Sequence, residues 1–368
     1  MKTISFSLIF SLVFITACTN DSSVTEQIVN GSKVTICSYE KVVKNETIAL
    51  SSLVENCRLI RLEDIDEALF KLWFTTVTDK YIGVIPAAEG PYKLFDSSGK
   101  FLCDVGSIGQ GPGEYALSIY DDLIDDKNER IYLTTFLDDK IYVYDTSGKF
   151  IKNIVAPQYL HKPKMHLSED GKLTVVHMAF PGENAVSIQF DSEGNVINQL
   201  APIPHFFVQD HNGEIFNSRN TPAFEFLHTS SDTLYHYSIE RNKIEPVFTL
   251  AVNSTEKPFR QYIELNNMYI TTIWSKKQTI VTDMKTKRSS FVKVRNDYFG
   301  NMDVALNVST LRNGWFVLNL EPWQLIEMIE KRLQESDCTA KDKQKLKALQ
   351  DSLDENSNNV LFVGILKP

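Results

Sequence analysis

The stretch that decides the fold is residues 140–151, KIYVYDTSGKFI. Similar stretches occur at residues 93–102, KLFDSSGKFL, and at residues 188–197, IQFDSEGNVI. Each has an alternating strand, an Asp, a turn that contains Gly, and a second strand. The chain therefore repeats one strand-turn-strand unit.

The spacing of these units is regular. Their aspartates, Asp96, Asp145 and Asp191, stand 49 and 46 residues apart, and two further steps of 46 reach Tyr237 and Asp283. A period of this length made of strands and turns is typical of propeller blades. We therefore predict an all-β, six-bladed β-propeller.

Six blades can be placed along the chain. Five are continuous, at residues 74–105, 117–155, 165–200, 206–252 and 269–294. The sixth combines residues 305–308 and 315–320 with two strands that have no neighbouring partner, at 57–62 and 360–366. Pairing those two strands would close the ring and remove both exposed sheet edges.

A helical insertion interrupts the last blade. Pro322 stands at a helix start, and apolar residues such as Leu325, Ile329 and Leu346 follow at helical spacing. We predict a helical hairpin over about residues 322–355. Its apolar stripe is expected to pack on the propeller.

Residues 1–17 have the features of a signal peptide. Lys2 is followed by an apolar run at residues 4–16, too short to span a bilayer, and the segment ends in Ile-Thr-Ala-Cys at Cys18. This end resembles a bacterial lipoprotein signal, with Cys18 as the lipid attachment site; a plain secretory signal is the alternative. Residues 18–50 would form a tether and N-terminal extension, with 19–30 as a polar tether, and residues 51–368 the propeller. A lipidated Cys18 would hold the protein on a membrane, on the periplasmic side or at the cell surface.

Net charge and cysteine spacing bear on the possible partners and on metal binding. The net charge of −9 argues against a nucleic-acid partner. The four remaining cysteines, Cys37, Cys57, Cys103 and Cys338, match no metal motif. Three full disulfide pairings are possible, but we expect buried free thiols.

The chain resembles the six-bladed β-propeller lipoproteins of bacteria. The resemblance rests on Cys18, on SLVENCRLIRLE at residues 52–63, on IGQGPGEY at 108–115, on the FDSSGKFL and YDTSGKFI repeats, and on NNVLFVGILK at 358–367. GQGPGEY is also similar to the repeat of NHL propellers. The resemblance implies a propeller in the cell envelope and supplies no catalytic residue or cofactor.

Three features suggest chemistry but have simpler interpretations. The glycines at residues 106–113 lack the helix and the Lys-Ser/Thr of a phosphate loop, so we interpret them as a connection between blades, where Glu114 caps amides or faces a ligand. The acidic pairs Asp121–Asp122, Asp125–Asp126 and Asp138–Asp139 lack EF-hand spacing and are interpreted as solvated turns. The seven histidines have no short metal-ligand spacing, so no metal or cofactor is predicted.

Loop length predicts the binding face. Connections between blades lie on one face, and those at residues 106–116, 156–164 and 252–266 are long. Functional groups concentrate on long loops held by a rigid scaffold. Candidate ligand-binding residues are Glu114, His205, Arg219 and Trp274.

We expect a membrane-tethered binding module that engages a protein or glycan through this face. The alternative is a propeller enzyme, a lyase or hydrolase, with a metal or carboxylate pair at the ring axis. A third possibility is a structural subunit of an envelope complex. The absence of a G-x-S-x-G or H-E-x-x-H motif favours the binding module.

Overall fold

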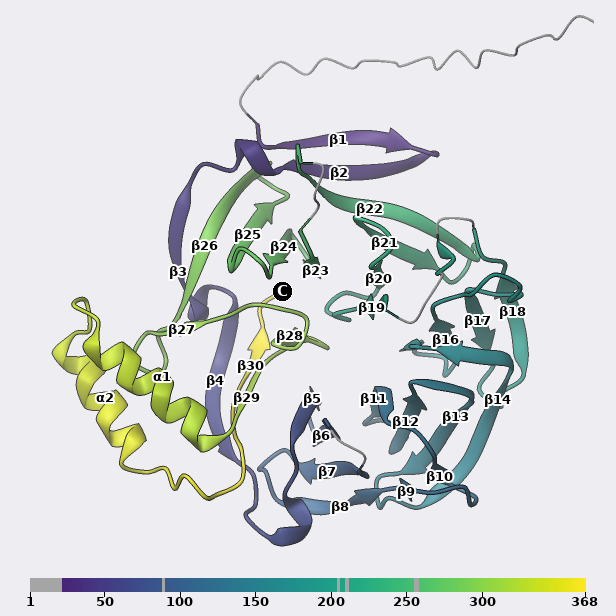
Figure 1. The fold of residues 1–368 in the computed structure, drawn as a ribbon, viewed down its shortest axis with the longest axis horizontal. Helices are drawn as coiled ribbons and strands as arrows, with labels where there is room; N and C mark the ends of the chain where they lie inside the picture. Colours follow the sequence, from purple (N-terminus) through teal and green to yellow (C-terminus); the bar gives the residue numbers. More distant parts are fainter. Residues whose placement is uncertain (1–21, 88–89, 204–205, 209–211, 255–257) are drawn as a thin grey trace, which may run out of the picture.

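The structure is a computed structural model that describes residues 22–87, 90–203, 206–208, 212–254 and 258–368. Six β-sheets surround one axis (Figure 1). The predicted six-bladed propeller is confirmed.

In each blade, the first strand lies at the axis and the fourth at the rim. The strands of blades one to three are β5 (Leu72–Val77), β6 (Tyr81–Pro86), β7 (Tyr92–Asp96), β8 (Phe101–Val105), β11 (Ile119–Asp125), β12 (Arg130–Thr135), β13 (Leu137–Asp145), β14 (Phe150–His161), β15 (Lys164–Leu167), β16 (Leu173–Val176), β17 (Ser187–Phe190) and β18 (Val196–Leu200). Those of blades four to six are β19 (Ile215–Phe216), β20 (Phe224–His228), β21 (Thr233–Ser238), β22 (Lys243–Ala251), β23 (Arg260–Leu265), β24 (Met268–Ile273), β25 (Gln278–Asp283), β26 (Arg288–Asn296), β28 (Leu311–Arg312), β29 (Trp315–Leu320), β30 (Val360–Leu366) and β4 (Val54–Arg61). Two short strands, β9 (Ser107–Ile108) and β10 (Glu114–Tyr115), pair between blades one and two, and β27 (Met302–Val304) extends blade five.

The two faces of the ring carry different connections. We call the side with the connections between blades and the turns between second and third strands the crossover face. The opposite side, with the other two turns of each blade, is the turn face. Because neighbouring strands within a blade are antiparallel, first strands begin and second strands end at the crossover face.

The two ends of the propeller meet in blade six. Strand β4 pairs antiparallel with β30, and Leu59 stands opposite Phe362. The predicted closure is therefore confirmed. Strand β4, from the N-terminal part of the chain, completes the sheet of β28, β29 and β30, so blade six has four strands like blades one to three.

The repeated Asp holds the turn between third and fourth strands. Asp145 Oδ1 accepts hydrogen bonds from the backbone N–H groups of Ser147 at 2.9 Å and Lys149 at 3.0 Å. Gly148 closes the turn with a φ of +81°, a conformation that favours glycine. Asp96 and Asp191 form the same turn, which explains why the motif recurs.

The hydrophobic core is divided into six layers, one between each pair of neighbouring blades. The layer between blades five and six also receives α1 (Pro322–Gln334) and α2 (Ala340–Gln350), through Leu325, Ile329 and Leu346. Pro322 begins α1 as predicted, and Glu321 and Gln324 form a capping box. The helical pair thus covers one blade boundary, as Figure 1 shows at the left of the ring.

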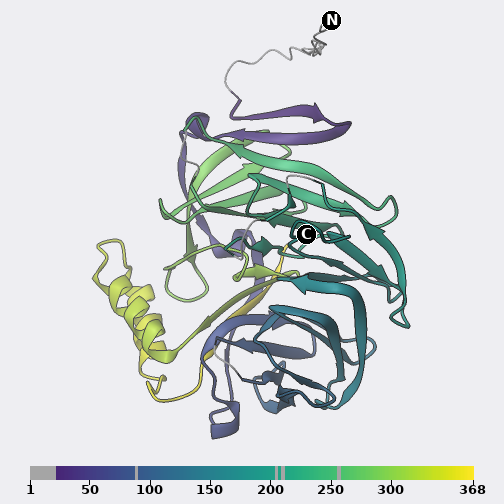
Figure 2. The same ribbon diagram turned by 45° about the vertical axis from the view of Figure 1, so that its right-hand side comes forward.

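The N-terminal extension departs from the predicted tether. Residues 24–29 form β1 (Val24–Val29), which pairs with β2 (Ser32–Ser38), and β2 continues blade four beside β22. Strand β3 (Asn45–Ala49) is added to blade five beside β26. The hairpin of β1 and β2 lies along the rim of the ring (Figure 2). Backbone pairing with sheet edges thus orders a segment whose composition suggested a tether.

Two predicted connections are shorter than expected. Residues 156–161 continue β14, and blade five begins at Arg260 with β23, so strands occupy much of both segments.

The four cysteines are free thiols. Burial raises the pKa of Cys57 to about 12 and that of Cys103 to about 11. Within the described chain, no helix has the length and apolar character to cross a membrane.

Candidate functional site

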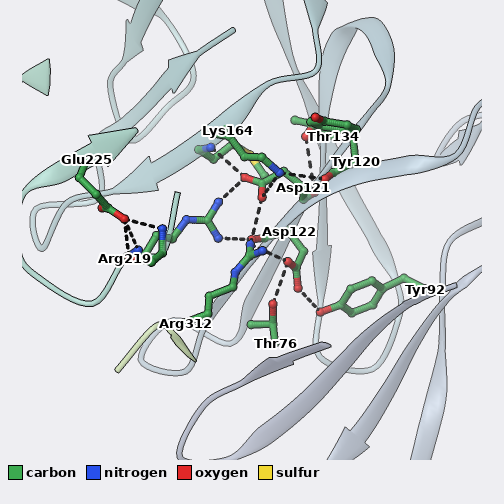
Figure 3. A network of polar contacts seen from close by, with 12 residues as sticks. Thr76, Tyr92, Tyr120, Asp121, Asp122, Thr134, Lys164, Arg219, Glu225 and Arg312 are labelled. Carbon is green, nitrogen blue, oxygen red and sulfur yellow. Dashed lines mark hydrogen bonds and ion pairs between the residues drawn. The ribbon is translucent and has the colours of Figure 1, made fainter. Parts of the chain in front are cut away.

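A network of buried charges lies among the innermost strands of the ring (Figure 3). Asp121 and Asp122 project from β11, Lys164 from β15 and Arg312 from β28. Arg219 comes from the loop between β19 and β20, on the turn face, and has a φ of +55°. Four of the six blades thus supply a charge to one cluster.

Asp121 is the centre of this network and is fully buried. Its Oδ1 receives Arg312 Nη2 at 3.0 Å and Lys164 Nζ at 3.4 Å. Its Oδ2 pairs with Arg219 Nη2 and accepts the Met165 backbone N–H at 2.8 Å. Three cations and one amide therefore occupy both oxygens.

Asp122, also fully buried, joins blade one to the network. Its Oδ1 accepts hydrogen bonds from Thr76 Oγ1 at 2.9 Å and Arg312 Nη2 at 3.3 Å. Its Oδ2 accepts the Tyr92 hydroxyl at 2.7 Å. Burial and the Asp122 carboxylate raise the pKa of Tyr92, so this phenol remains a donor.

The charges in this network set each other's ionisation. Burial alone would raise the pKa of Asp121, but Arg219, Lys164 and Arg312 outweigh it and hold that pKa below its ordinary value. Burial lowers the pKa of Lys164 to about 8, against the attraction of Asp121. Burial raises the pKa of Glu225, which accepts from the Ser218 hydroxyl at 2.7 Å and the Arg219 N–H at 2.8 Å.

The prediction that the acidic pairs are solvated turns is therefore wrong for Asp121–Asp122. Asp138 and Asp139 also lie in a strand, β13, where Asp138 accepts the Tyr142 hydroxyl at 2.6 Å. Only Asp125 and Asp126 adjoin a turn, and Asp125 accepts the Lys127 and Asn128 N–H groups there. A two-residue pattern cannot distinguish these cases, because burial depends on the other blades.

The axial carboxylates are poorly suited to catalysis. Both are inaccessible, and their oxygens are already occupied by protein donors. A substrate could reach them only by displacing ion pairs. The arrangement joins neighbouring blades at the ring axis.

On the crossover side of the network, a second cluster reaches the surface. Glu214 receives hydrogen bonds from the Tyr120 hydroxyl and Lys162 Nζ, both of which are buried, while its own side chain is 35% exposed. Trp73 packs against Tyr120 with ring centroids 5.7 Å apart. The crossover end of the ring axis therefore presents the Glu214 carboxylate, which two buried partners hold in place, near the exposed Trp73 indole.

Exposed aromatic side chains gather on the crossover face. Among the described residues, five aromatic side chains are strongly exposed: Trp73 43%, Tyr159 60%, Phe259 47%, Trp274 48% and Trp323 47%. Four lie at strand ends or connections of the crossover face, and Trp323 lies in the first turn of α1, in the insertion that follows the end of β29 at this face. Phe259 and Trp274 are direct neighbours, because the backbone N–H of Trp274 donates to the backbone carbonyl of Phe259 at 3.3 Å. Large exposed aromatic side chains are typical of recognition surfaces.

The candidate residues occupy different environments. Trp274 is exposed on the crossover face. Glu114 Oε2 accepts the Gly111 backbone N–H at 2.8 Å, and Glu114 lines a hollow of about 560 Å³ between this connection and strands β13 and β14 of blade two. Arg219 belongs to the buried network. Cys18 and His205 lie outside the described residues.

Lys164 and Arg312 were not identified from the sequence, nor were Trp73 and Glu214, and Asp121 was interpreted as part of a solvated turn. Lys164 and Arg312 lay outside the predicted strands, so no signal in the sequence indicated that they reach the axis. Within the described ranges, no group of three or more His, Cys, Asp or Glu side chains is placed to hold a metal ion.

A family profile described as "Domain of unknown function (DUF4934)" matches residues 34–364. The chain belongs to this family. The match covers all six blades and both closing strands of this DUF4934 propeller. A search of curated proteins gave no significant match.

A solved structure shares the fold of the DUF4934 propeller, and two further ones give lower similarity. A "putative exported protein" of Bacteroides fragilis superposes with a TM-score of 0.63 at 16% identity, over 90% of this chain and 100% of that one. A member of the DUF4221 family from Bacteroides vulgatus gives a TM-score of 0.46 at 10% identity, over 86% and 97% of the two chains. Virginiamycin B lyase from Staphylococcus aureus gives a TM-score of 0.38 at 12% identity, over 64% of this chain and 87% of that one. Identities this low carry no functional assignment.

Proposed function

We propose that this protein is an extracytoplasmic binding module, lipid-anchored through Cys18, that engages a protein or glycan through the crossover face. The observation that carries the proposal is that, among the described residues, the five strongly exposed aromatic side chains all belong to that face. Such side chains lose little conformational entropy on binding and cover a large contact area. The burial and full pairing of the axial carboxylates support binding at this surface without catalysis.

Site-specific photo-crosslinking tests this proposal, because it captures a bound molecule whose identity is unknown. A photoreactive residue replaces Trp73, Trp274 or Trp323 in the full chain, expressed in its native host. The matched control replaces Ile197, which is equally exposed on the outer strand β18. We expect adducts from the crossover positions and none from position 197, and digestion by a protease or a glycosidase then distinguishes a protein from a glycan.

Adducts from position 197 alone would contradict the proposed face. Turnover of the captured ligand by the purified protein would contradict a purely binding role. Once a ligand is captured, Trp274→Ala should weaken its binding by about 30-fold, as expected for a central aromatic contact worth about 2 kcal/mol. Ile197→Ala should leave binding unchanged.

A further inference from the structure

A basic hollow lies on the rim, where the N-terminal segment joins blade five. Its volume is about 560 Å³, and its charged lining consists of Lys41, Lys44 and Arg288 with the acidic Glu46 and Asp283, while Val43 lies on the side of the two lysines. Asp283 accepts hydrogen bonds from the Lys285 and Thr286 backbone N–H groups in its turn. Lys44 pairs with Glu46. Lys41 and Arg288 are exposed and form no ion pair within the described part of the chain. Their charges are therefore available to an external anion.

The outer part of blade five is rich in basic residues. Residues 274–296, which contain β25 and β26, include seven Lys or Arg and one Asp, whereas the whole chain has a net charge of −9. Lys287, Lys293 and Arg295 pair with carboxylates, which leaves four of these cations without an ion pair among the described residues. This imbalance favours contact with an extended anionic surface. Attraction of this kind acts over about 10 Å at ordinary salt.

The chain enters the fold beside this hollow. Ser22 Oγ donates to the Lys287 carbonyl at 2.8 Å, and Ser23 lines the hollow and hydrogen-bonds Ser289. Cys18, the predicted lipid attachment site, is only four residues before Ser22. Four extended residues span about 14 Å. A lipid on Cys18 would therefore keep this rim within reach of the bilayer.

An apolar side chain stands among these cations. Val43 is 82% exposed and lies between Lys41 and Lys44, where it has little contact with the fold. Exposed apolar residues flanked by basic ones are typical of surfaces that enter the lipid interface.

We propose that this rim docks on an anionic lipid bilayer, with Lys41 and Arg288 contacting lipid phosphates and Val43 entering the interface. The inference deepens the proposed lipid anchoring, because it assigns the side of the propeller that faces the membrane. The rim supplies a second membrane contact beside the acyl chains, and stable anchoring generally takes two such signals.

Vesicle sedimentation tests the docking without the lipid anchor. The unlipidated chain 19–368, which retains all six blades and both closing strands, is mixed with phosphatidylglycerol–phosphatidylcholine vesicles or with pure phosphatidylcholine vesicles. We expect binding to the anionic vesicles alone, weakened by salt. The double variant Lys41→Ala/Arg288→Ala should lower the affinity about 30-fold, since each basic residue near such a surface contributes about five-fold.

The matched control is Lys127→Ala/Lys149→Ala, which removes two exposed lysines from blade two. Equal loss in the control, equal binding to both vesicles, or no binding to either would overturn the docking surface. Acylation of Cys18, measured by mass spectrometry on the full chain, reports on the anchor independently. An unmodified Cys18 would refute the anchor while leaving the vesicle result intact.

Discussion

At the scale of single residues, the ionised state of Asp121 depends on three cations. Removing its charge leaves Arg219, Lys164 and Arg312 buried without their main counter-ion. We predict that Asp121→Asn lowers the free energy of unfolding by about 3–5 kcal/mol, as expected when one partner of a buried ion pair is removed. Urea unfolding followed by fluorescence measures this. Asp170→Asn, which removes an exposed partner of Lys172, is the control and should change little. Equal loss in both would contradict the role assigned to the network.

The same carboxylate should make stability depend on pH. The pKa of Asp121 is lowered in the folded state relative to its ordinary value of 3.8, so its contribution is present above that value and is lost as pH falls through the lowered pKa. We predict that the stability difference between wild type and Asp121→Asn shrinks as pH falls below about 4. Urea midpoints as a function of pH measure it. A difference that grows on acidification would show that the sign is wrong.

The contrast between two kinds of Asp shows what the sequence can predict about single residues. Asp145 bonds backbone groups two and four residues away, so its turn could be predicted from DTSGK. Asp121 contacts Lys164, Arg219 and Arg312, which are 43, 98 and 191 residues away. Such partners become visible only after the ring has closed.

At the scale of strands, loss of side-chain packing at the closing pair β4 and β30 should lower the stability of the whole propeller. Phe362 on β30 is fully buried and packs against Phe299 with ring centroids 4.8 Å apart. We predict that Phe362→Ala costs about 3–5 kcal/mol through the cavity it leaves. Ile365→Ala, on the same strand but 38% exposed, should cost much less. Thermal unfolding of both variants tests this, and similar melting temperatures would argue against closure as a main source of stability.

Strand β30 was predictable because its apolar run, VLFVGIL, had no partner nearby in the sequence. Strand β1 was not, because VTEQIV is exposed at all but its first residue. It is ordered mainly by backbone pairing and by contacts such as Ser22 with Lys287, 265 residues away. Edge strands held in this way leave little hydrophobic pattern to detect.

At the scale of the whole molecule, the two proposed surfaces are compatible. The basic hollow lies on the rim at blades four and five, whereas the aromatic residues lie on the crossover face. Docking by the rim would set the ring axis roughly parallel to the bilayer (Figure 1). The crossover face would then point sideways and stay accessible to a partner in the same compartment. A propeller lying with its crossover face on the membrane would instead block that face.

Fluorescent labelling distinguishes these orientations. We predict that a probe on Val43→Cys is quenched by a lipid-phase quencher in phosphatidylglycerol vesicles, whereas a probe on Ile108→Cys, across the ring, is not. Selective labelling is feasible at neutral pH, because burial raises the pKa of Cys57 to about 12 and that of Cys103 to about 11, and the thiolate is the reactive form. Quenching at position 108 but not at 43 would place the opposite rim on the membrane. Equal quenching at both would indicate that the ring lies flat.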